Sequence, residues 1–322
     1  MKLQKTFPYF AGKKVLYVHG FASAGSSNTV KLLQAMMPEA TVLGPDLPIH
    51  PAEALDLLHE ICATEKPALV VGTSMGGMYT EQLYGIDRIC VNPALQMGET
   101  IRTTIGLGKI TFQNPRKDGV QEFMLTKALQ SEYADACKGN FSGVSAEERG
   151  RVVGLFGLHD DVVHTYDLFA AHYPMAVQFD GGHRLTESAL IHSVMPMVRR
   201  FHLRQTQTEP PVLYVHLRAL QKADGTAVAG ATHAFEILAQ TYQTYIVAPQ
   251  NARPQEWLRD NVGVNAYDRI ILTNHPEMLY GDYYIDTQKP QKDVLGTLLV
   301  LGSEKFKSWD DFLDYFELLG GQ

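Results

Sequence analysis

The chain has 322 residues, enough for about two domains, and its 45% hydrophobic and 20% charged residues are the balance of a folded globular protein. This balance argues against disordered, collagen-like and membrane-spanning proteins. The formal net charge is −7 and no long basic block occurs, so we expect no nucleic-acid partner.

The cysteines and the N-terminus indicate the compartment. Cys62, Cys90 and Cys137 lack C-x-x-C spacing, which favours reduced thiols over a disulfide framework or a zinc site. Residues 1–14 contain lysines but no apolar segment of the kind found in signal peptides. No apolar run approaches the roughly 18 residues that span a bilayer. The sequence therefore predicts a cytoplasmic protein with no membrane association.

Short apolar runs alternate with amphipathic stretches between residues 14 and 203. This alternation predicts a doubly wound, mostly parallel sheet with helices on both faces. Strands are expected at 15–18, 40–43, 68–71, 88–91, 151–156 and 176–179. Helices are expected at 30–37, 52–63, 76–84 and 187–203, where apolar residues recur every three or four positions.

Residues 97–150 interrupt the alternation with polar, glycine-bearing sequence and one helix-like piece at 122–136. Long insertions are often lids or binding loops. Loops also accept insertions at little entropic cost, so a surface excursion without function is the alternative.

A polar segment at 205–211 ends in two prolines and marks a domain boundary. Beyond it, strands are expected at 212–215, 244–247, 269–272, 283–285 and 298–301, and helices at 232–240, 254–262 and 309–319. The sequence thus predicts an α/β domain at 1–204, a linker at 205–211 and a smaller Rossmann-like domain at 212–322.

A serine lies where the third predicted strand turns into a helix. Residues 72–76, Gly-Thr-Ser-Met-Gly, match G-x-S-x-G, and the central serine is Ser74. The glycines on either side leave room for a turn sharp enough to raise the hydroxyl above the sheet. This context predicts that Ser74 is a nucleophile.

A serine nucleophile needs a histidine base that is oriented by a carboxylate. His183 follows a predicted strand and a glycine pair, a position at which α/β sheets present chemistry. Asp160 follows the preceding strand and is the predicted acid. Asp161 is the alternative, and it could instead cap the helix expected near Thr165. The order Ser74, Asp160, His183 is that of α/β-hydrolases.

An acyl-transfer site also needs donors for the oxyanion. The first predicted strand runs into His19-Gly20-Phe21, where the glycine lets the backbone approach a substrate. We expect the backbone N–H groups of Phe21 and Met75 to form the oxyanion hole. His19 precedes the glycine, and we interpret it as a hydrogen-bonded brace of this loop rather than as a base.

Four residues are candidates for the lining of the substrate pocket: His19, Gly20, Met97 and Ile101. The two apolar ones belong to the insertion and would favour a hydrophobic acyl group. They could equally form the core of a lid.

The motifs HGF, GPDLP, GTSMGG, NPAL, HDDVV and GGHRL, in this order, resemble the serine α/β-hydrolase superfamily. The likeness is greatest to small bacterial YqiA-type esterases and covers about the first 200 residues. It implies a hydrolase of a small-molecule ester or thioester, with Ser74, Asp160 and His183 as the triad and with no cofactor or metal. Leu158-His159 replaces that group's usual acidic-loop sequence, so Asp161 stays the alternative to Asp160 as the acid.

The C-terminal part resembles the haloacid dehalogenase-like superfamily, most closely its 5′(3′)-deoxyribonucleotidases. The likeness rests on PVLYVHLRAL, IILTNH, GDYYID and GSEKF. That family's chemistry uses two aspartates in a D-x-D motif, which also place Mg²⁺, but here these positions hold His216 and Arg218. Three further positions of the family's pattern are also altered: Ala248, Pro276 and the pair Asp286-Thr287.

Neither an aspartyl-phosphate nor an oxygen-ligated Mg²⁺ site is therefore expected in this domain. We interpret it as an inactive phosphatase frame used for packing against the hydrolase, for dimerisation or for an unknown ligand. His216 and Arg218 could still bind an anion, because arginine suits phosphate geometry.

Two functions compete on this evidence. The first is a serine hydrolase, and the second is a non-catalytic binding or regulatory protein whose C-terminal domain recruits a partner or an anion. An apparently complete triad favours the first.

Overall fold

The computed structural model describes residues 5–320, and the chain divides into two units, Met1–His202 and Leu203–Gln322. Each unit is built around its own parallel sheet, and helices accompany both sheets, so the predicted α/β class is confirmed. Within residues 5–320, no helix combines the length and the hydropathy needed to cross a bilayer.

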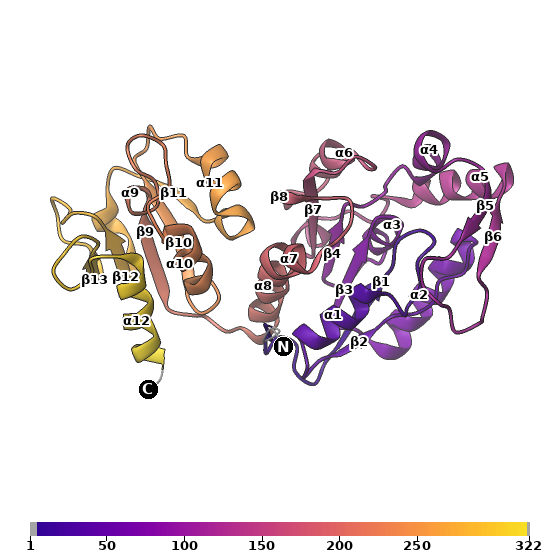
Figure 1. Ribbon diagram of the computed structural model, residues 1–322, viewed down its shortest axis with the longest axis horizontal. Helices are drawn as coiled ribbons and strands as arrows, with labels where there is room; N and C mark the ends of the chain where they lie inside the picture. Colours follow the sequence, from indigo (N-terminus) through magenta and orange to yellow (C-terminus); the bar gives the residue numbers. More distant parts are fainter. Residues whose placement is uncertain (1–4, 321–322) are drawn as a thin grey trace. The chain divides into compact units, whose positions relative to one another are not determined.

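The first unit contains a six-stranded sheet in which all strands run parallel (Figure 1). The strand order is β2-β1-β3-β4-β7-β8, so the winding direction reverses between β2 and β3. Most of the strands are runs of apolar residues buried on both faces, as parallel strands covered by helices require. Their bounds are β1 (Lys14–Val18), β2 (Thr41–Leu43), β3 (Leu69–Thr73), β4 (Arg88–Val91), β7 (Val152–His159) and β8 (Ala176–Gly182).

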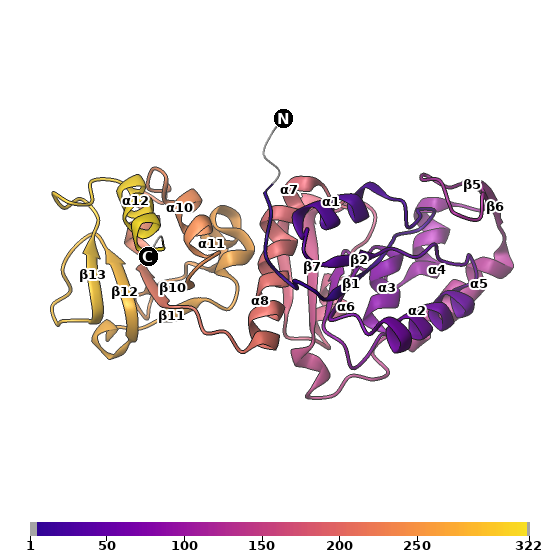
Figure 2. The same ribbon diagram turned by 90° about the horizontal axis from the view of Figure 1, so that it is seen from below.

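Helices cover both faces of this sheet, and Figure 2 shows α1 and α2 on opposite sides of it. Leu16, Val18 and Val70 face a core that they share with α2 and α3. The helices are α1 (Asn28–Met36), α2 (Pro51–Glu65), α3 (Met75–Glu81), α6 (Tyr166–Ala170), α7 (Glu187–Ala189) and α8 (Met195–Thr206), with a π-helical turn at Leu190–Val194.

The insertion folds into two helices and an antiparallel hairpin. Its elements are α4 (Met97–Thr100), a π-helical turn (Ile101–Ile105), β5 (Gly108–Thr111), β6 (Glu122–Leu125), α5 (Lys127–Ala136) and two short 3₁₀ turns (Cys137–Gly139, Glu148–Gly150). The helix predicted at 122–136 was wrong for its first residues, which pair with β5 instead. Helix α5 begins after Thr126, whose hydroxyl accepts the N–H of Leu129 at 3.2 Å. Such a side-chain cap defines a helix start.

The second unit contains a five-stranded parallel sheet in the order β11-β10-β9-β12-β13. Helix α12 contributes Trp309, Phe312 and Phe316 to the core, and the indole N–H of Trp309 donates to the Ala219 carbonyl at 2.9 Å. The strands are β9 (Val212–His216), β10 (Gln243–Ala248), β11 (Ile270–Leu272), β12 (Tyr280–Asp286) and β13 (Leu295–Val300). The helices are α9 (Leu217–Leu220), α10 (Ala231–Leu238), α11 (Gln255–Asn261) and α12 (Trp309–Gly320), with 3₁₀ turns at Gly263–Ala266 and Pro276–Met278.

Helix α8 continues through Thr206, so the linker predicted at 205–211 begins two residues too early. Glutamine is a good helix former, and Gln205 lies within the helix, which ends before Gln207, a residue with φ 53°.

Candidate active site

Ser74 lies between β3 and α3 with φ 54° and ψ −120°, a backbone conformation that is costly for a residue with a side chain. Its N–H donates to the Val91 carbonyl at 2.9 Å, which ties the turn to the neighbouring strand β4. A Cβ at Gly76 would overlap the carbonyl oxygens of Val18 and His19, and one at Gly72 would overlap the carbonyl of Gly76. Both glycines are therefore required by close backbone approaches.

The structure brings Ser74, His183 and Asp160 into one hydrogen-bonded series. His183 Nε2 is 3.1 Å from Ser74 Oγ, and His183 Nδ1 is 2.9 Å from Asp160 Oδ2. The side chain of Asp160 is 4% exposed and that of His183 is 20% exposed. Asp161, the alternative acid, is an exposed residue. The geometry therefore pairs the histidine with Asp160.

Asp160 stays ionised because its hydrogen bonds outweigh its burial. Burial alone would raise the pKa of Asp160, but the hydrogen bonds from His183 and from the N–H groups of Val163 and Val162 lower the pKa below its ordinary value. These two N–H groups donate to Oδ1 at 2.9 and 2.8 Å. The carboxylate can therefore hold His183 Nδ1–H and stabilise an imidazolium.

Asn92 positions the strand ends that carry these residues, and we did not identify it from the sequence. It follows β4, is 2% exposed and has φ 44°. Its side-chain oxygen accepts the Gly157 N–H at 2.7 Å, and its side-chain nitrogen donates to the carbonyls of Gly182 at 3.0 Å and His183 at 3.3 Å. Asn92 thus connects β7 and β8 beside the triad. The available signal was a polar side chain directly after a buried apolar strand.

The buried side chain of His19 connects the loop after β1 with the loop after β2 by hydrogen bonds. Its Nδ1 lies 2.8 Å from the Gly20 carbonyl, which can only accept, and its Nε2 accepts the Leu47 N–H at 3.2 Å. These partners require the neutral ring with hydrogen on Nδ1. Burial lowers the pKa of His19, in keeping with this form, while the Gly20 carbonyl opposes the shift.

The brace fixes the peptide that carries the Phe21 N–H. The Gly20 carbonyl and the Phe21 N–H belong to one planar trans peptide and point in opposite directions. A carbonyl held toward His19 therefore sets the direction of the Phe21 N–H. A Cβ at Gly20 would lie 3.4 Å from Ser74 Cβ, so this peptide is next to the serine. The Met75 N–H follows Ser74 at the start of α3.

The insertion packs against the residue whose amide is the predicted oxyanion donor. The Phe21 ring makes edge-to-face contacts with Phe123 of β6 and Tyr133 of α5, at centroid distances of 5.7 and 5.9 Å. The pocket candidates Met97 and Ile101 are 1% and 0% exposed and belong to this same hydrophobic core. Both side chains lie in the core that the insertion shares with the sheet, α2 and α3.

The loop between β5 and β6 is hydrogen-bonded to the loops that follow β1 and β2. The Gln113 N–H donates to the Ala22 carbonyl at 2.8 Å, and the Lys117 N–H donates to Asp46 Oδ2 at 2.7 Å. Arg116 Nη1 donates to the Leu47 carbonyl at 3.0 Å. The hairpin therefore reaches Leu47, whose N–H contacts His19.

In the second unit, three residues that the sequence comparison with haloacid dehalogenase-like proteins singled out meet at one edge of the sheet. His216 ends β9, Asp286 ends β12, and Arg218 lies in α9. Arg218 Nε and Nη2 donate to the two oxygens of Asp286 at 2.6 and 2.7 Å. Across residues 5–320, no group of three or more His, Cys, Asp or Glu side chains is placed to hold a metal ion.

A serine on a strained strand-to-helix turn, followed in the chain by an aspartate and a histidine at later strand ends of a parallel sheet, defines the α/β-hydrolase class. Residues 14–194 match the family described as "Uncharacterised protein family (UPF0227)", and the chain belongs to this family.

Two solved structures are similar to part of the chain. One is described as "LipS and LipT, two metagenome-derived lipolytic enzymes", with 17% identity, coverage of 58% of this chain and 93% of that one, and a TM-score of 0.40. Another is Est1E from Butyrivibrio proteoclasticus, with 16% identity, coverage of 64% and 90%, and a TM-score of 0.40.

A curated relative from Vibrio phage KVP40 has the name "Putative 5′(3′)-deoxyribonucleotidase". It is 26% identical over 116 residues, which is 33% of this chain. The chain spans 64% of that relative's length.

Proposed function

We propose that the chain is a serine hydrolase that cleaves a carboxylic ester or thioester through an acyl-enzyme on Ser74. The observation that carries this proposal is the series from Ser74 Oγ through His183 to Asp160, with contacts of 3.1 and 2.9 Å. A serine activated by an oriented imidazole is the arrangement that acyl transfer requires.

The first half-reaction forms the acyl-enzyme. Ser74 Oγ attacks the acyl carbon while His183 Nε2 accepts the hydroxyl proton, and Asp160 stabilises the resulting imidazolium. The N–H groups of Phe21 and Met75 donate to the oxyanion. When the C–O or C–S bond breaks, His183 gives its proton to the leaving alcohol or thiol.

The second half-reaction releases the acid. Water attacks the acyl carbon while His183 again accepts a proton, and collapse of the tetrahedral intermediate returns that proton to Ser74 Oγ. The product is a carboxylic acid, and no cofactor enters the scheme.

We further propose that the C-terminal unit does not hydrolyse phosphate esters. His216 and Arg218 occupy the positions of the nucleophilic and acid/base aspartates in the family that this unit resembles, and both oxygens of Asp286 already accept N–H groups of Arg218. We expect no phosphate release from nucleoside monophosphates with or without Mg²⁺. Mg²⁺-dependent release above background would contradict this part of the proposal.

A fluorophosphonate probe tests the nucleophile. We expect the probe to label the wild type and not Ser74→Ala. The variant should also lose at least about 10⁴-fold in kcat, because base and nucleophile act as one unit. p-Nitrophenyl esters and acyl-CoA thioesters of graded chain length would serve as substrates and would define the preferred acyl group. Equal labelling of wild type and variant would overturn the proposal.

A further inference from the structure

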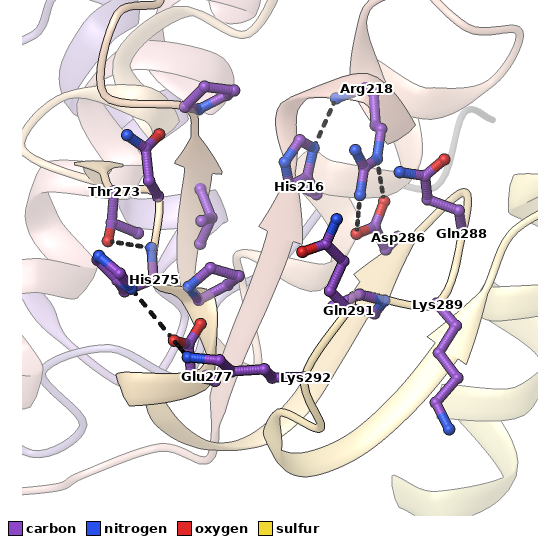
Figure 3. A pocket seen from close by; sticks show the side chains of 15 residues that line it. His216, Arg218, Thr273, His275, Glu277, Asp286, Gln288, Lys289, Gln291 and Lys292 are labelled. Carbon is purple, nitrogen blue, oxygen red and sulfur yellow. Dashed lines mark hydrogen bonds and ion pairs between the residues drawn. The ribbon is translucent and has the colours of Figure 1, made fainter.

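A cavity of about 380 Å³ lies at the carboxyl edge of the sheet in the second unit (Figure 3). Its wall includes the last residues of β9 and β12, His216 and Asp286, and residues 273–277 after β11. Strand β9 is the first of the unit and has β10 on one side and β12 on the other. Ligands of open parallel sheets bind at such a switch point, and the volume is within the range of small-molecule sites.

Asp286 is a carboxylate with no exposed surface in this wall, and its charge is neutralised from within the chain. Arg218 holds it by two contacts, Nε to Oδ1 at 2.6 Å and Nη2 to Oδ2 at 2.7 Å. Oδ1 also accepts the Thr287 N–H at 2.7 Å. A buried carboxylate without a cation would be very costly, and here the cation is a guanidinium.

The residues do not fit the divalent metal that the phosphatase resemblance implies. Mg²⁺ requires several oxygen ligands in octahedral geometry. The positions of the two expected aspartates hold His216 and Arg218, and the oxygens of Asp286 are already occupied by N–H donors. The guanidinium brings its own positive charge to the place where that metal would lie.

The second hydrogen-bonding edge of the guanidinium, formed by Nη1 and Nη2, faces the exposed side chain of Gln288. The Arg218 side chain is 37% exposed, whereas that of Asp286 is 0% exposed. Turning the Gln288 amide by 180° from the orientation drawn in Figure 3 relieves the opposition of N–H groups, and its oxygen then accepts from Arg218 Nη1 at 2.9 Å and from Nη2 at 3.2 Å. Gln288 is an exposed residue, so a ligand oxygen can take the place of its amide oxygen at little cost.

His216 is prepared to donate to the same ligand. Its Nδ1 accepts the Arg218 N–H at 3.2 Å, which leaves the hydrogen of the neutral ring on Nε2. An imidazole in this tautomer donates from Nε2 and is no nucleophile there.

The charges of the wall favour an anion. Its cations are Arg218, Lys289 and Lys292, and its carboxylates are Asp286 and Glu277. Lys292 contacts Glu277 at 3.0 Å, and Lys289 contacts Asp293 at 3.4 Å. Both lysines are about 70% exposed, and exposed ion pairs of this kind are weak, so both ammonium groups can turn toward a bound anion.

We propose that this cavity binds a small molecule by an oxyanion head group, phosphate or carboxylate, without a metal ion. Arg218 takes the role of the divalent cation by bridging two anions, with Asp286 on one edge and the ligand on the other in place of the Gln288 oxygen. The site is independent of Ser74 and goes beyond ester hydrolysis.

Calorimetric titration of the full chain tests the proposal, with inorganic phosphate in one arm and succinate in the other. We expect one anion to bind with a stoichiometry of one, and the tighter arm identifies the head group. The Kd should agree within about twofold between EDTA and millimolar Mg²⁺, because no metal takes part. Failure of both anions to bind, or binding that requires Mg²⁺, would overturn the proposal.

Two variants keep the test specific. Arg218→Lys retains the positive charge beside Asp286 but cannot bind two oxyanions through two planar pairs of N–H groups. It should weaken anion binding about tenfold. Arg259→Lys, a substitution of the same kind on α11 outside the cavity wall, should not change the Kd. The exposed pair Lys289→Gln/Lys292→Gln should weaken binding about threefold and reduce its salt dependence. Unchanged affinity in both cavity variants would contradict the site, and Ser74→Ala should bind as the wild type does.

Discussion

Each unit places a buried aspartate at the carboxyl end of a parallel strand and pairs it with a nitrogen-bearing side chain from elsewhere in the chain. After β7, Asp160 contacts His183 at 2.9 Å, and at the end of β12, Asp286 contacts Arg218 at 2.6 and 2.7 Å. The two units differ in the chemistry of the side chain that contacts the aspartate. Imidazole titrates near neutral pH and has a second nitrogen for Ser74, whereas a guanidinium stays protonated. A buried carboxylate is thus paired with a possible proton carrier in one unit and with a fixed positive charge in the other.

The largest effect is expected from removing the charge of the first aspartate. Asp160→Asn should lower kcat by about 10⁴-fold, because the amide cannot hold the required histidine tautomer. Its neighbour provides a matched control, since Asp161 is exposed, and Asp161→Asn should stay within about twofold. Steady-state kinetics on the best p-nitrophenyl ester measure both, and similar losses in the two variants would refute the assignment of Asp160.

Breaking the Arg218–Asp286 ion pair of the second unit should lower the free energy of unfolding and leave ester hydrolysis unchanged. Arg218→Met leaves Asp286 buried without a cation and should lower the free energy of unfolding by about 3 kcal/mol. Arg218→Met/Asp286→Leu removes both charges and should recover most of that loss.

Tryptophan fluorescence can compare the unfolding of the single and double variants. The chain's two tryptophans, Trp257 and Trp309, both lie in the second unit, so selectively excited tryptophan fluorescence during urea unfolding follows that unit alone. A double variant no more stable than the single one would show that the pair is not the source of the loss.

A smaller effect on kcat is expected from removing the His19 side chain, which holds the loop that carries the Phe21 N–H. His19→Ala frees the peptide that carries the Phe21 N–H, and we expect kcat to fall by about ten- to a hundredfold with KM nearly unchanged. His59→Ala, an exposed histidine on α2, is the matched control. A rise in KM at constant kcat would assign His19 to substrate binding instead.

The smallest effect concerns acid stability. The pKa of folded Asp160 lies below its ordinary value, so its stabilising contribution is complete above the unfolded pKa of about 3.9 and is lost as the pH falls through the lowered folded pKa. Hydrogen exchange of β7 and β8 peptides should therefore lose protection over this acid range more steeply in the wild type than in Asp160→Asn. Equal slopes would contradict the lowered pKa.

Much of the first site could be predicted from sequence because its parts are local. Ser74 is flanked by glycines that the backbone approaches require, and His183 and Asp160 each follow an apolar strand. Parallel strands place such residues at one edge of the sheet, so their order in the chain was sufficient to bring them together.

The contacts of Asn92 and of the Arg218–Asp286 pair could not be predicted in this way. Residues 218 and 286 are 68 positions apart, and nothing local in the sequence indicates that their side chains form an ion pair. The hairpin was missed because Glu-Phe-Met-Leu at 122–125 consists mostly of good helix formers, while its pairing with β5 is decided by tertiary structure.

The position of helix α8 has a practical consequence for producing the units separately. The division between the units falls between His202 and Leu203, within a helix that runs from Met195 to Thr206. A fragment that stops at residue 202 would lose the last turn and expose the carbonyls that this turn satisfies. A fragment of the first unit should therefore extend at least to residue 206, and a fragment of the second unit should begin after it.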